Sequence, residues 1–159
     1  MLLLFIYKGG YMGLRGFEVV SSFIAEKINI PVRQTIYSAG YDLAACGDYT
    51  IEPGQIVRLS TGLKAYMQND EFLGIHIRSS LAIKKQIILV NAQGIIDKDY
   101  YNNLDNEGHI IVALMNIGSQ MVSIKNGERV AQGIFYKYLL TDDDNASNMR
   151  LSGVGSTGV

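Results

Sequence analysis

The sequence predicts an all-β fold, and its composition carries the prediction. The 159 residues contain 17 Gly but only 2 Pro, and the glycines separate many short apolar runs. Such runs, bounded by turn residues at close spacing, are typical of a sandwich, a jelly roll or a barrel. Hydrophobic residues make up 48% of the chain and charged residues 18%. One folded domain with a substantial core is therefore expected.

Turn residues divide the chain into a series of expected extended segments. These cover residues 16–20, 28–32, 38–45, 49–51, 56–60, 63–67, 72–78, 87–90, 94–96, 109–115, 121–124 and 130–138. Asn126-Gly127, ahead of the last segment, is a strong hairpin signal. Ser79 or Ser80 can cap one short helix that runs through Lys85. Residues 101–108 are expected to form a polar loop.

The composition changes near both ends of the chain. Apolar periodicity disappears at Thr141, so residues 12–140 are expected to form the β domain and residues 141–159 a mobile C-terminal tail. Lys8-Gly9-Gly10, shortly before Met12, is what translation of a ribosome-binding site would produce. Residues 1–11 are therefore either a non-native leader, with Met12 as the biological start, or a genuine short extension, and both interpretations stay open.

Charge and cysteine content argue against several classes of protein. The net charge of −1 gives no general attraction to nucleic acid or to an anionic membrane, so neither is expected as a partner. No apolar run reaches the length of a membrane span. Cys46 is the single cysteine, which excludes an intrachain disulfide and suggests a reducing, cytoplasmic compartment. Cys46 and the distant His76 and His109 cannot assemble a zinc site.

The stretch from Asn91 to Tyr100 is the strongest candidate for a functional centre. Gly94-Ile95-Ile96 is typical of a short strand that runs into a tight, acidic connection. Asp97 and Asp99 are two residues apart and would share a face on an extended chain. With an aromatic ring beside it, a carboxylate could hold a water and a flat-ringed ligand. Taken alone, an acidic turn after a strand is more often an ordinary hairpin turn with no functional role.

Three further stretches could bind phosphate. Arg78-Ser79-Ser80 stands at a strand-to-helix junction, where a guanidinium, two hydroxyls and free N–H groups suit an anion. Gly127 to Gln132 is a hairpin that leads into a strand whose Gln could donate to a phosphate. The terminal glycines would let backbone N–H groups approach phosphates closely, with side chains of Arg150, Ser156 and Thr157 as further donors. Each stretch also has a plain alternative: a surface Arg beside a capped helix, a solvated strand Gln and a disordered terminus.

Together with Ala39-Gly40-Tyr41-Asp42-Leu43, these four stretches follow one another in an order that resembles the five motifs of the trimeric dUTPase family. The resemblance covers about residues 16–158, and five ordered motifs are far more specific than any single one. It implies a β jelly roll with one short helix that forms a homotrimer. One subunit would supply the first, second and fourth motifs of each active site, a second subunit the third motif, and the third subunit its tail.

The resemblance also implies roles for individual residues. The reaction would be hydrolysis of dUTP to dUMP and pyrophosphate, which lowers dUTP and supplies dUMP for thymidylate synthesis. Asp97 would activate the attacking water, and Tyr100 would exclude a ribose 2′-OH. The uracil would be read by Asn91 and the backbone of Gly94, Ile95 and Ile96, with the two isoleucines anchored in the core. The expected phosphate contacts are Arg78, Ser79, Ser80, Gln132, Arg150, Gly155, Ser156 and Thr157. Asp42 and Asp99 would support the site, and Mg²⁺ would be held by the triphosphate and waters rather than by side chains.

The chain departs from the family pattern at two places. Val154 stands where the family usually has a Phe that covers the uracil, so stacking by the tail would be lost there. The family usually has Tyr-x-Gly in its third motif, whereas here Tyr100 is followed by Tyr101-Asn102-Asn103 and a Gly appears only at Gly108. The loop beyond the base is therefore longer.

Two other functions share the expected fold. In Arg78-Ser79-Ser80-Leu81-Ala82 the chain looks more like the dCTP deaminase family, but that family needs a Glu where this chain has Ala113. Without a carboxylate there, a cytosine ring lacks its proton shuttle. The other alternative is a nucleotide-sensing regulatory protein, and the presence of Asp97, Gln132 and Arg150 argues against it.

Overall fold

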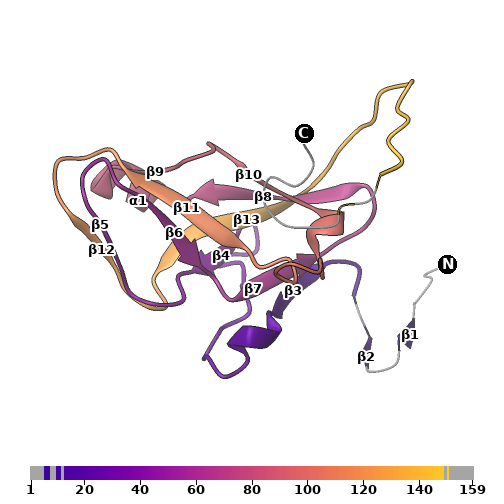
Figure 1. Ribbon diagram of the computed structural model, residues 1–159, viewed down its shortest axis with the longest axis horizontal. Helices are drawn as coiled ribbons and strands as arrows, with labels where there is room; N and C mark the ends of the chain where they lie inside the picture. Colours follow the sequence, from indigo (N-terminus) through magenta and orange to yellow (C-terminus); the bar gives the residue numbers. More distant parts are fainter. Residues whose placement is uncertain (1–5, 8–9, 12, 149, 151–159) are drawn as a thin grey trace.

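The computed structural model describes residues 6–7, 10–11, 13–148 and 150, and the expected all-β architecture is confirmed (Figure 1). The described strands are β1 (Ile6–Tyr7), β2 (Gly10–Tyr11), β3 (Gly16–Val19), β4 (Tyr41–Ala44), β5 (Tyr49–Ile51), β6 (Ile56–Ser60), β7 (Leu63–Tyr66), β8 (Glu71–Ile77), β9 (Ile87–Leu89), β10 (Gly94–Asp97), β11 (Ile111–Asn116), β12 (Val122–Ile124) and β13 (Arg129–Lys137). The helical elements of the same residues are the 3-10 turns η1 (Ser21–Phe23) and η2 (Lys98–Tyr100) and the α-helix α1 (Ser79–Lys85). The expected extended segment at 28–32 lies in a loop instead.

Two antiparallel sheets form the body of the molecule. The larger has the strand order β10-β8-β13-β4, and the smaller has the order β6-β11-β9. The shorter pairs are β12-β5, β3-β7 and β1-β2. The β5–β12 pair forms one end of the molecule (Figure 1). No helix in the described part of the chain is long and apolar enough to cross a membrane.

One apolar core joins the two sheets, because alternate residues of their strands point inward. Burial alternates along β11, where Val112 and Leu114 are buried and Ala113 between them is partly exposed. Leu73 of β8 and Leu59 of β6 have no exposed surface and belong to the same apolar cluster. Full burial of an aliphatic side chain of this size contributes roughly 1.5–3 kcal/mol. This cluster therefore holds the two sheets face to face.

β9 and β10 follow one another in sequence but belong to different sheets. β9 pairs with β11, whereas β10 pairs with β8 at the edge of the larger sheet. The connection at residues 90–93 therefore crosses from one sheet to the other. It is fixed by hydrogen bonds from Val90 N to Ala113 O at 3.0 Å and from Ala92 N to Leu89 O at 3.1 Å, with Ala92 at a φ of 57°.

The start of α1 differs from the expectation. Arg78 is the N-cap residue and no side chain makes a cap hydrogen bond, so the prediction that Ser79 or Ser80 caps the helix is wrong. The extended backbone of Arg78 (φ −77°, ψ 135°) is the conformation that an N-cap requires, and Ser79 is already helical. Both serines therefore lie in the first helical turn.

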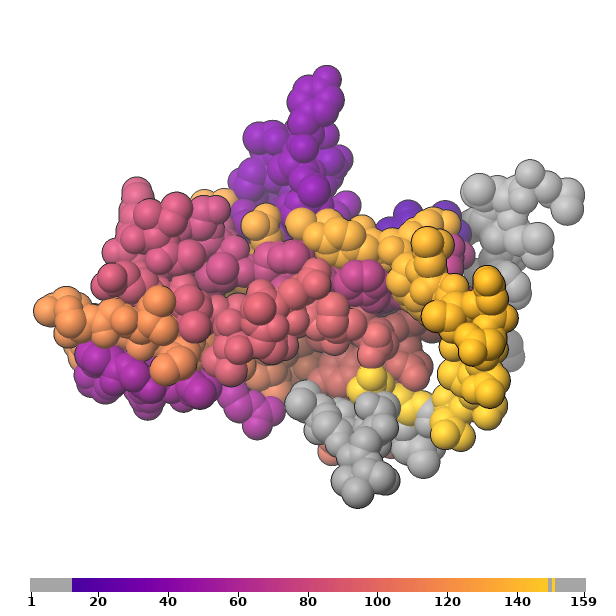
Figure 2. All heavy atoms as spheres, turned by 90° about the horizontal axis from the view of Figure 1, so that it is seen from above, coloured from indigo at the N-terminus to yellow at the C-terminus, as the bar shows by residue number. Residues whose placement is uncertain are grey.

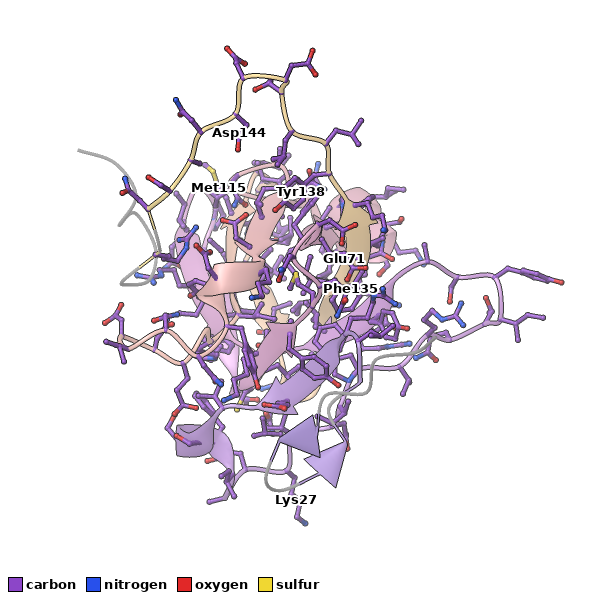
Figure 3. The ribbon with its side chains drawn as sticks, turned by 90° about the vertical axis from the view of Figure 1, so that its right-hand side faces the viewer. Lys27, Glu71, Met115, Phe135, Tyr138 and Asp144 are labelled. Atoms are coloured by element: carbon purple, nitrogen blue, oxygen red, sulfur yellow. The ribbon has the colours of Figure 1, made fainter. Side chains whose placement is uncertain are left out.

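Two segments project from the body. The loop before β4 holds Ile36 and Tyr37, which are 77% and 92% exposed, and this region forms the purple projection of Figure 2. After β13 the chain continues beyond the sheet, and Figure 3 shows Asp144 well away from Glu71 and Phe135, which lie within the body.

Candidate active site

A cavity of about 450 Å³, here called the seam cavity, opens where the β9–β10 connection passes from one sheet to the other. Its walls come from both sheets and from the segment that follows β10. The lining residues are Arg58, Ile75, Leu89, Asn91, Gly94, Ile95, Ile96, Asp97, Tyr100, Asp105, Asn106, Ile111, Val112, Ala113 and Arg150. Aliphatic walls with a few convergent polar groups are typical of a small-molecule site.

Gly94, the first residue of β10, lies close to the cavity wall. A Cβ on Gly94 would lie 3.1 Å from Ile75 Cβ and 3.7 Å from Asn91 Nδ2, so a side chain there would crowd the wall. Ile96 packs against the core, whereas Ile95 is 50% exposed. The expectation that both isoleucines anchor this strand in the core is wrong for Ile95, because neighbouring strand residues face opposite sides.

Two carboxylates converge on one guanidinium at the rim of the seam cavity. Asp97 ends β10, and Asp99 lies in η2, so the two do not sit on one extended segment as expected. Arg150 nevertheless reaches both: its Nη2 lies 2.6 Å from Asp97 Oδ2 and its Nε 3.1 Å from Asp99 Oδ1. Its Cζ is 5.8 Å from the centroid of the Tyr100 ring, within the range of a cation–π contact.

Tyr100 is held at its hydroxyl end. The residue is 6% exposed and its side chain forms part of the cavity wall. The hydroxyl donates to His109 O at 3.0 Å and accepts a hydrogen bond from Asn106 Nδ2 at 2.8 Å. Burial lowers the pKa of His109, which favours the neutral imidazole, and its Nε2 accepts a hydrogen bond from Gly62 N at 3.1 Å. The ring is therefore fixed by two hydrogen bonds in addition to its packing.

A second cavity of about 290 Å³, here called the junction cavity, lies where β8 runs into α1. Its lining residues are Gln34, Ser38, Gly40, Asp42, Arg78, Ser79, Ser80 and Gln132. Gln132 of β13 is paired with Asp42 of β4 on one side and with His76 of β8 on the other. A Cβ on Gly40 would overlap the end of the Gln132 side chain, so a larger residue there would force that side chain to move.

Asp42 connects two arginines at the junction cavity. Its Oδ1 lies 3.3 Å from Arg78 Nε, and its Oδ2 accepts a hydrogen bond from Arg129 Nη1 at 2.9 Å. Arg78 also donates to the backbone oxygen of Arg129 at 3.3 Å. The network joins the first, second and fourth predicted motifs and holds two guanidinium groups together. Such groups bind phosphate oxygens through charge-assisted hydrogen bonds.

Comparison with known proteins decides the family. The family model described as dUTPase matches residues 26–158 of the chain. The deoxyuridine 5'-triphosphate nucleotidohydrolase of Lactococcus lactis subsp. lactis (strain IL1403) is 48% identical over 149 residues, which are 92% of this chain and 99% of that protein. The chain belongs to the dUTPase family.

Solved structures of the family have the same fold. The crystal structure of the dUTPase from Streptococcus mutans matches with a TM-score of 0.75 and 46% identity, covering 80% of this chain and 98% of that chain. A mutant dUTPase from phage phi11 of S. aureus matches with a TM-score of 0.69 at 14% identity, covering 86% and 98% of the two chains. Both the predicted fold class and the predicted family are confirmed.

In this member of the dUTPase family the predicted site residues fall into two groups. The seam cavity collects Asn91, Gly94, Ile95, Ile96, Asp97, Tyr100 and Arg150, with Asp99 bound to Arg150. The junction cavity collects Asp42, Arg78, Ser79, Ser80 and Gln132. Of the predicted phosphate contacts among the described residues, a single protomer thus brings only Arg150 to the cavity of the predicted water activator, and the others lie in the junction cavity. Gly155, Ser156 and Thr157, with Val154, lie outside the described residues.

Both cavities of this dUTPase-family chain contain residues that sequence reasoning missed. Gln34 and Ser38 line the junction cavity, and Arg58, Asp105 and Asn106 line the seam cavity. Arg58 reaches the seam cavity because β6 pairs with β11, which puts it opposite Ala113. For Asp105 and Asn106 the one available signal was the departure from the Tyr-x-Gly pattern of the family.

Proposed function

We propose that the chain hydrolyses dUTP to dUMP and pyrophosphate, with Asp97 holding the water that attacks the α-phosphorus. The observation that carries the proposal is the grouping of Asp97, Tyr100 and Asn91 around one cavity in a member of the dUTPase family. The side chain of Asp97 is 46% exposed, so water can reach it. Because a carboxylate is a weak base, its main contribution is to hold the water in line with the bond that breaks.

The uracil and the sugar of the substrate bind in the seam cavity. Asn91 and the backbone of Gly94 to Ile96 read the edge of the base, and the missing Cβ at Gly94 lets the base approach the backbone. The deoxyribose lies on the ring of Tyr100. Two hydrogen bonds at its hydroxyl keep this ring from moving aside. A ribose 2′-OH therefore overlaps with the ring, and the ribonucleotide is rejected.

The phosphates bind in the junction cavity of a second protomer of a homotrimer. The separation of Asp97 from Arg78, Ser80 and Gln132 within one protomer supports this arrangement, because a complete site then needs two β domains (residues 12–140). Cyclic symmetry generates three equivalent sites from one such contact. The tail (residues 141–159) of the third protomer completes each site through Arg150, Gly155, Ser156 and Thr157.

Mg²⁺ is the cofactor of the proposed reaction. The phage phi11 protein was solved with a structural Mg(II) ion, although at 14% identity that likeness concerns the fold. In this chain Gln34, Ser38 and Gln132 offer oxygen atoms at the junction cavity, which suit hydrogen bonding to the waters around a hard cation. When bound with the triphosphate, the ion neutralises charge on the phosphate oxygens.

The reaction takes place in the cytoplasm. Cys46 is the single cysteine of the chain, so no intrachain disulfide can form, and this cysteine usage suits a reducing compartment. Cell fractionation tests the location.

Four nucleotides test the reaction. The purified chain is incubated with dUTP, dCTP, dTTP or UTP in the presence of Mg²⁺, and pyrophosphate and ammonia are measured. Pyrophosphate from dUTP alone supports the proposal, and EDTA should remove the activity until Mg²⁺ is restored. Ammonia from dCTP would show a deaminase, although Ala113 in the seam cavity offers no carboxylate for that chemistry. Binding without turnover would show a nucleotide sensor.

A further inference from the structure

The loop at residues 101–108, which is longer than the family pattern, is an ordered hydrogen-bonded structure. Asn102, Glu107 and Gly108 adopt φ values of 55°, 58° and 84°. Asn102 N donates to Glu107 O at 3.0 Å, which closes the loop at its base. Inside it, Asn103 is 8% exposed, and its Oδ1 accepts hydrogen bonds from the backbone of Asp105 and Asn106 at 3.0 and 3.1 Å.

The loop is also attached to the body of the molecule, beside β3 and β7 (Figure 1). Lys64 of β7 donates from Nζ to Asn102 Oδ1 at 2.6 Å and to Glu107 Oε2 at 3.1 Å. Tyr101 donates to Glu18 of β3 at 2.7 Å. Hydrogen bonds from Ser21 hold the pKa of Glu107 down to about 2, so its carboxylate stays charged as a partner for Lys64. The position of the loop is therefore set by the sheet.

A chain of hydrogen bonds runs from this loop to both ends of Tyr100. Asn103 Nδ2 donates to Tyr100 O at 2.7 Å and to Asn106 Oδ1 at 2.9 Å. Asn106 Nδ2 donates in turn to the Tyr100 hydroxyl at 2.8 Å, so the hydrogen bonds link the backbone oxygen of Tyr100 to its hydroxyl through the two asparagines. A Cβ on Gly108 would lie 2.6 Å from Tyr100 O, so only glycine lets the loop return this close.

We propose that Asn106 is a positioning residue for Tyr100, and that through this contact the 101–108 loop sets the preference for deoxyribonucleotides over ribonucleotides. The inference rests on the proposed function, in which the ring of Tyr100 lies under the sugar. A ring held by packing alone can tilt and leave room for a 2′-OH. The hydrogen bond from Asn106 fixes the tilt, and Asn106 itself also lines the seam cavity.

The test compares kcat/KM for dUTP and for UTP in the full-length wild type, in Asn106→Ala and in Leu104→Ala. Leu104 is the matched control, because it is 94% exposed on the same loop. We expect the dUTP/UTP ratio of kcat/KM to fall about fivefold in Asn106→Ala, the effect of one hydrogen bond. The ratio should not change in Leu104→Ala. A merely structural role for Asn106 would lower both values together and leave the ratio unchanged.

Tyr100→Phe removes the hydroxyl that accepts the hydrogen bond from Asn106. It therefore tests the same contact if Asn106→Ala does not fold. We expect a fall in the ratio at least as large, because phenylalanine also loses the hydrogen bond to His109 O. Adding Asn106→Ala should cause no further fall, because its contact with the Tyr100 hydroxyl is then already absent. An unchanged ratio in either folded single variant, or a further fall in the double variant, overturns the inference.

Tyr100→Ala separates this inference from the proposed function. If removal of the ring abolishes discrimination while Asn106→Ala keeps the wild-type ratio, the proposed function stands and the role of Asn106 is refuted. A wild-type protein that hydrolyses dUTP and UTP equally well overturns both.

Discussion

Arg150 donates a hydrogen bond from Nη2 to Oδ2 of Asp97 at 2.6 Å, so an arginine near the C-terminus lies on the carboxylate proposed to hold the attacking water. Its Nε also binds Asp99 at 3.1 Å. The phosphates of a nucleotide offer the same guanidinium a similar pair of oxygens. We therefore expect substrate to compete with Asp97 for an arginine, which frees the carboxylate for its water.

Arg150→Ala should lower kcat/KM for dUTP by about tenfold to a hundredfold, because a charged hydrogen bond to substrate is lost. Arg150→Lys should not restore the activity, since an ammonium lacks the planar, two-pronged geometry of a guanidinium. Steady-state kinetics measures both variants. Lys125→Ala serves as the control, because Lys125 forms an exposed pair with Asp48 and neither residue lines the seam cavity or the junction cavity. Full activity of Arg150→Ala would remove this residue from the site.

Asp97→Asn should keep nucleotide binding and lose turnover. The amide has nearly the shape of the carboxylate, but it cannot accept the proton of the attacking water. We expect kcat to fall by about a hundredfold or more, while calorimetry shows dUTP still bound. Asp48→Asn, on the exposed surface, should behave as wild type. Unchanged turnover in Asp97→Asn would refute the role of this carboxylate.

Two inactive variants should restore activity when they assemble together. Asp97→Asn damages the seam cavity and Arg78→Ala the junction cavity. If each site combines these cavities from different protomers, random mixing in a trimer leaves about a quarter of the sites with both halves intact. Co-expression of the two chains, followed by a dUTP assay of the purified mixture, measures the recovery.

The matched control for this mixing experiment pairs Asp97→Asn with Asp97→Ala. Both changes lie in the seam cavity, so no arrangement of the two chains yields an intact site. This mixture should stay inactive. If the Asp97→Asn and Arg78→Ala mixture is equally inactive, each site is built within one protomer.

The ion pair of Arg15 and Glu71 should contribute to stability rather than to activity. Arg15 Nη2 lies 2.5 Å from Glu71 Oε1, its Nε donates to Oε2 at 2.9 Å, and Glu71 is 4% exposed. Arg15→Ala leaves the buried carboxylate without its charged donor. We expect the free energy of unfolding to fall by about 2 kcal/mol, measured by urea denaturation. Lys137→Ala should have little effect, because its pair with Asp70 is exposed on both sides.

This ion pair also predicts a loss of stability in acid. The hydrogen bonds from Arg15 lower the pKa of Glu71 from its ordinary value of 4.5. A carboxyl whose pKa is lower when folded than when unfolded stabilises the protein fully above the unfolded value, and the contribution is lost as pH falls through the folded value. Urea denaturation at a series of pH values should therefore show wild-type stability falling below about pH 4.5. The difference between wild type and Arg15→Ala should shrink over the same range, and a constant difference would contradict the assignment.

The strand pattern could be predicted because each short apolar run is bounded by local turn signals, as at Asn126-Gly127 after β12. The helix cap could not, because Ser79 and Ser80 are both good cap residues, whereas the extended backbone of Arg78 at the end of β8 makes Arg78 the N-cap instead of either serine. Ile95 was wrongly assigned to the core, because sequence alone does not say which face of a short edge strand points inward. The contact between Arg150 and Asp99 spans 51 positions, and no local pattern reports it.

The sequence by itself determined the all-β class and the family, and it singled out Asp97 and Tyr100 as candidates, because motifs and turn signals are local patterns that can be read along the chain. Only the tertiary structure decided that these residues divide between two cavities, and that Asn106 holds the hydroxyl of Tyr100. The physical reason is that both outcomes depend on which strands pair and where loops return. Those are long-range relations, set by burial of the shared core and by hydrogen bonds between distant segments.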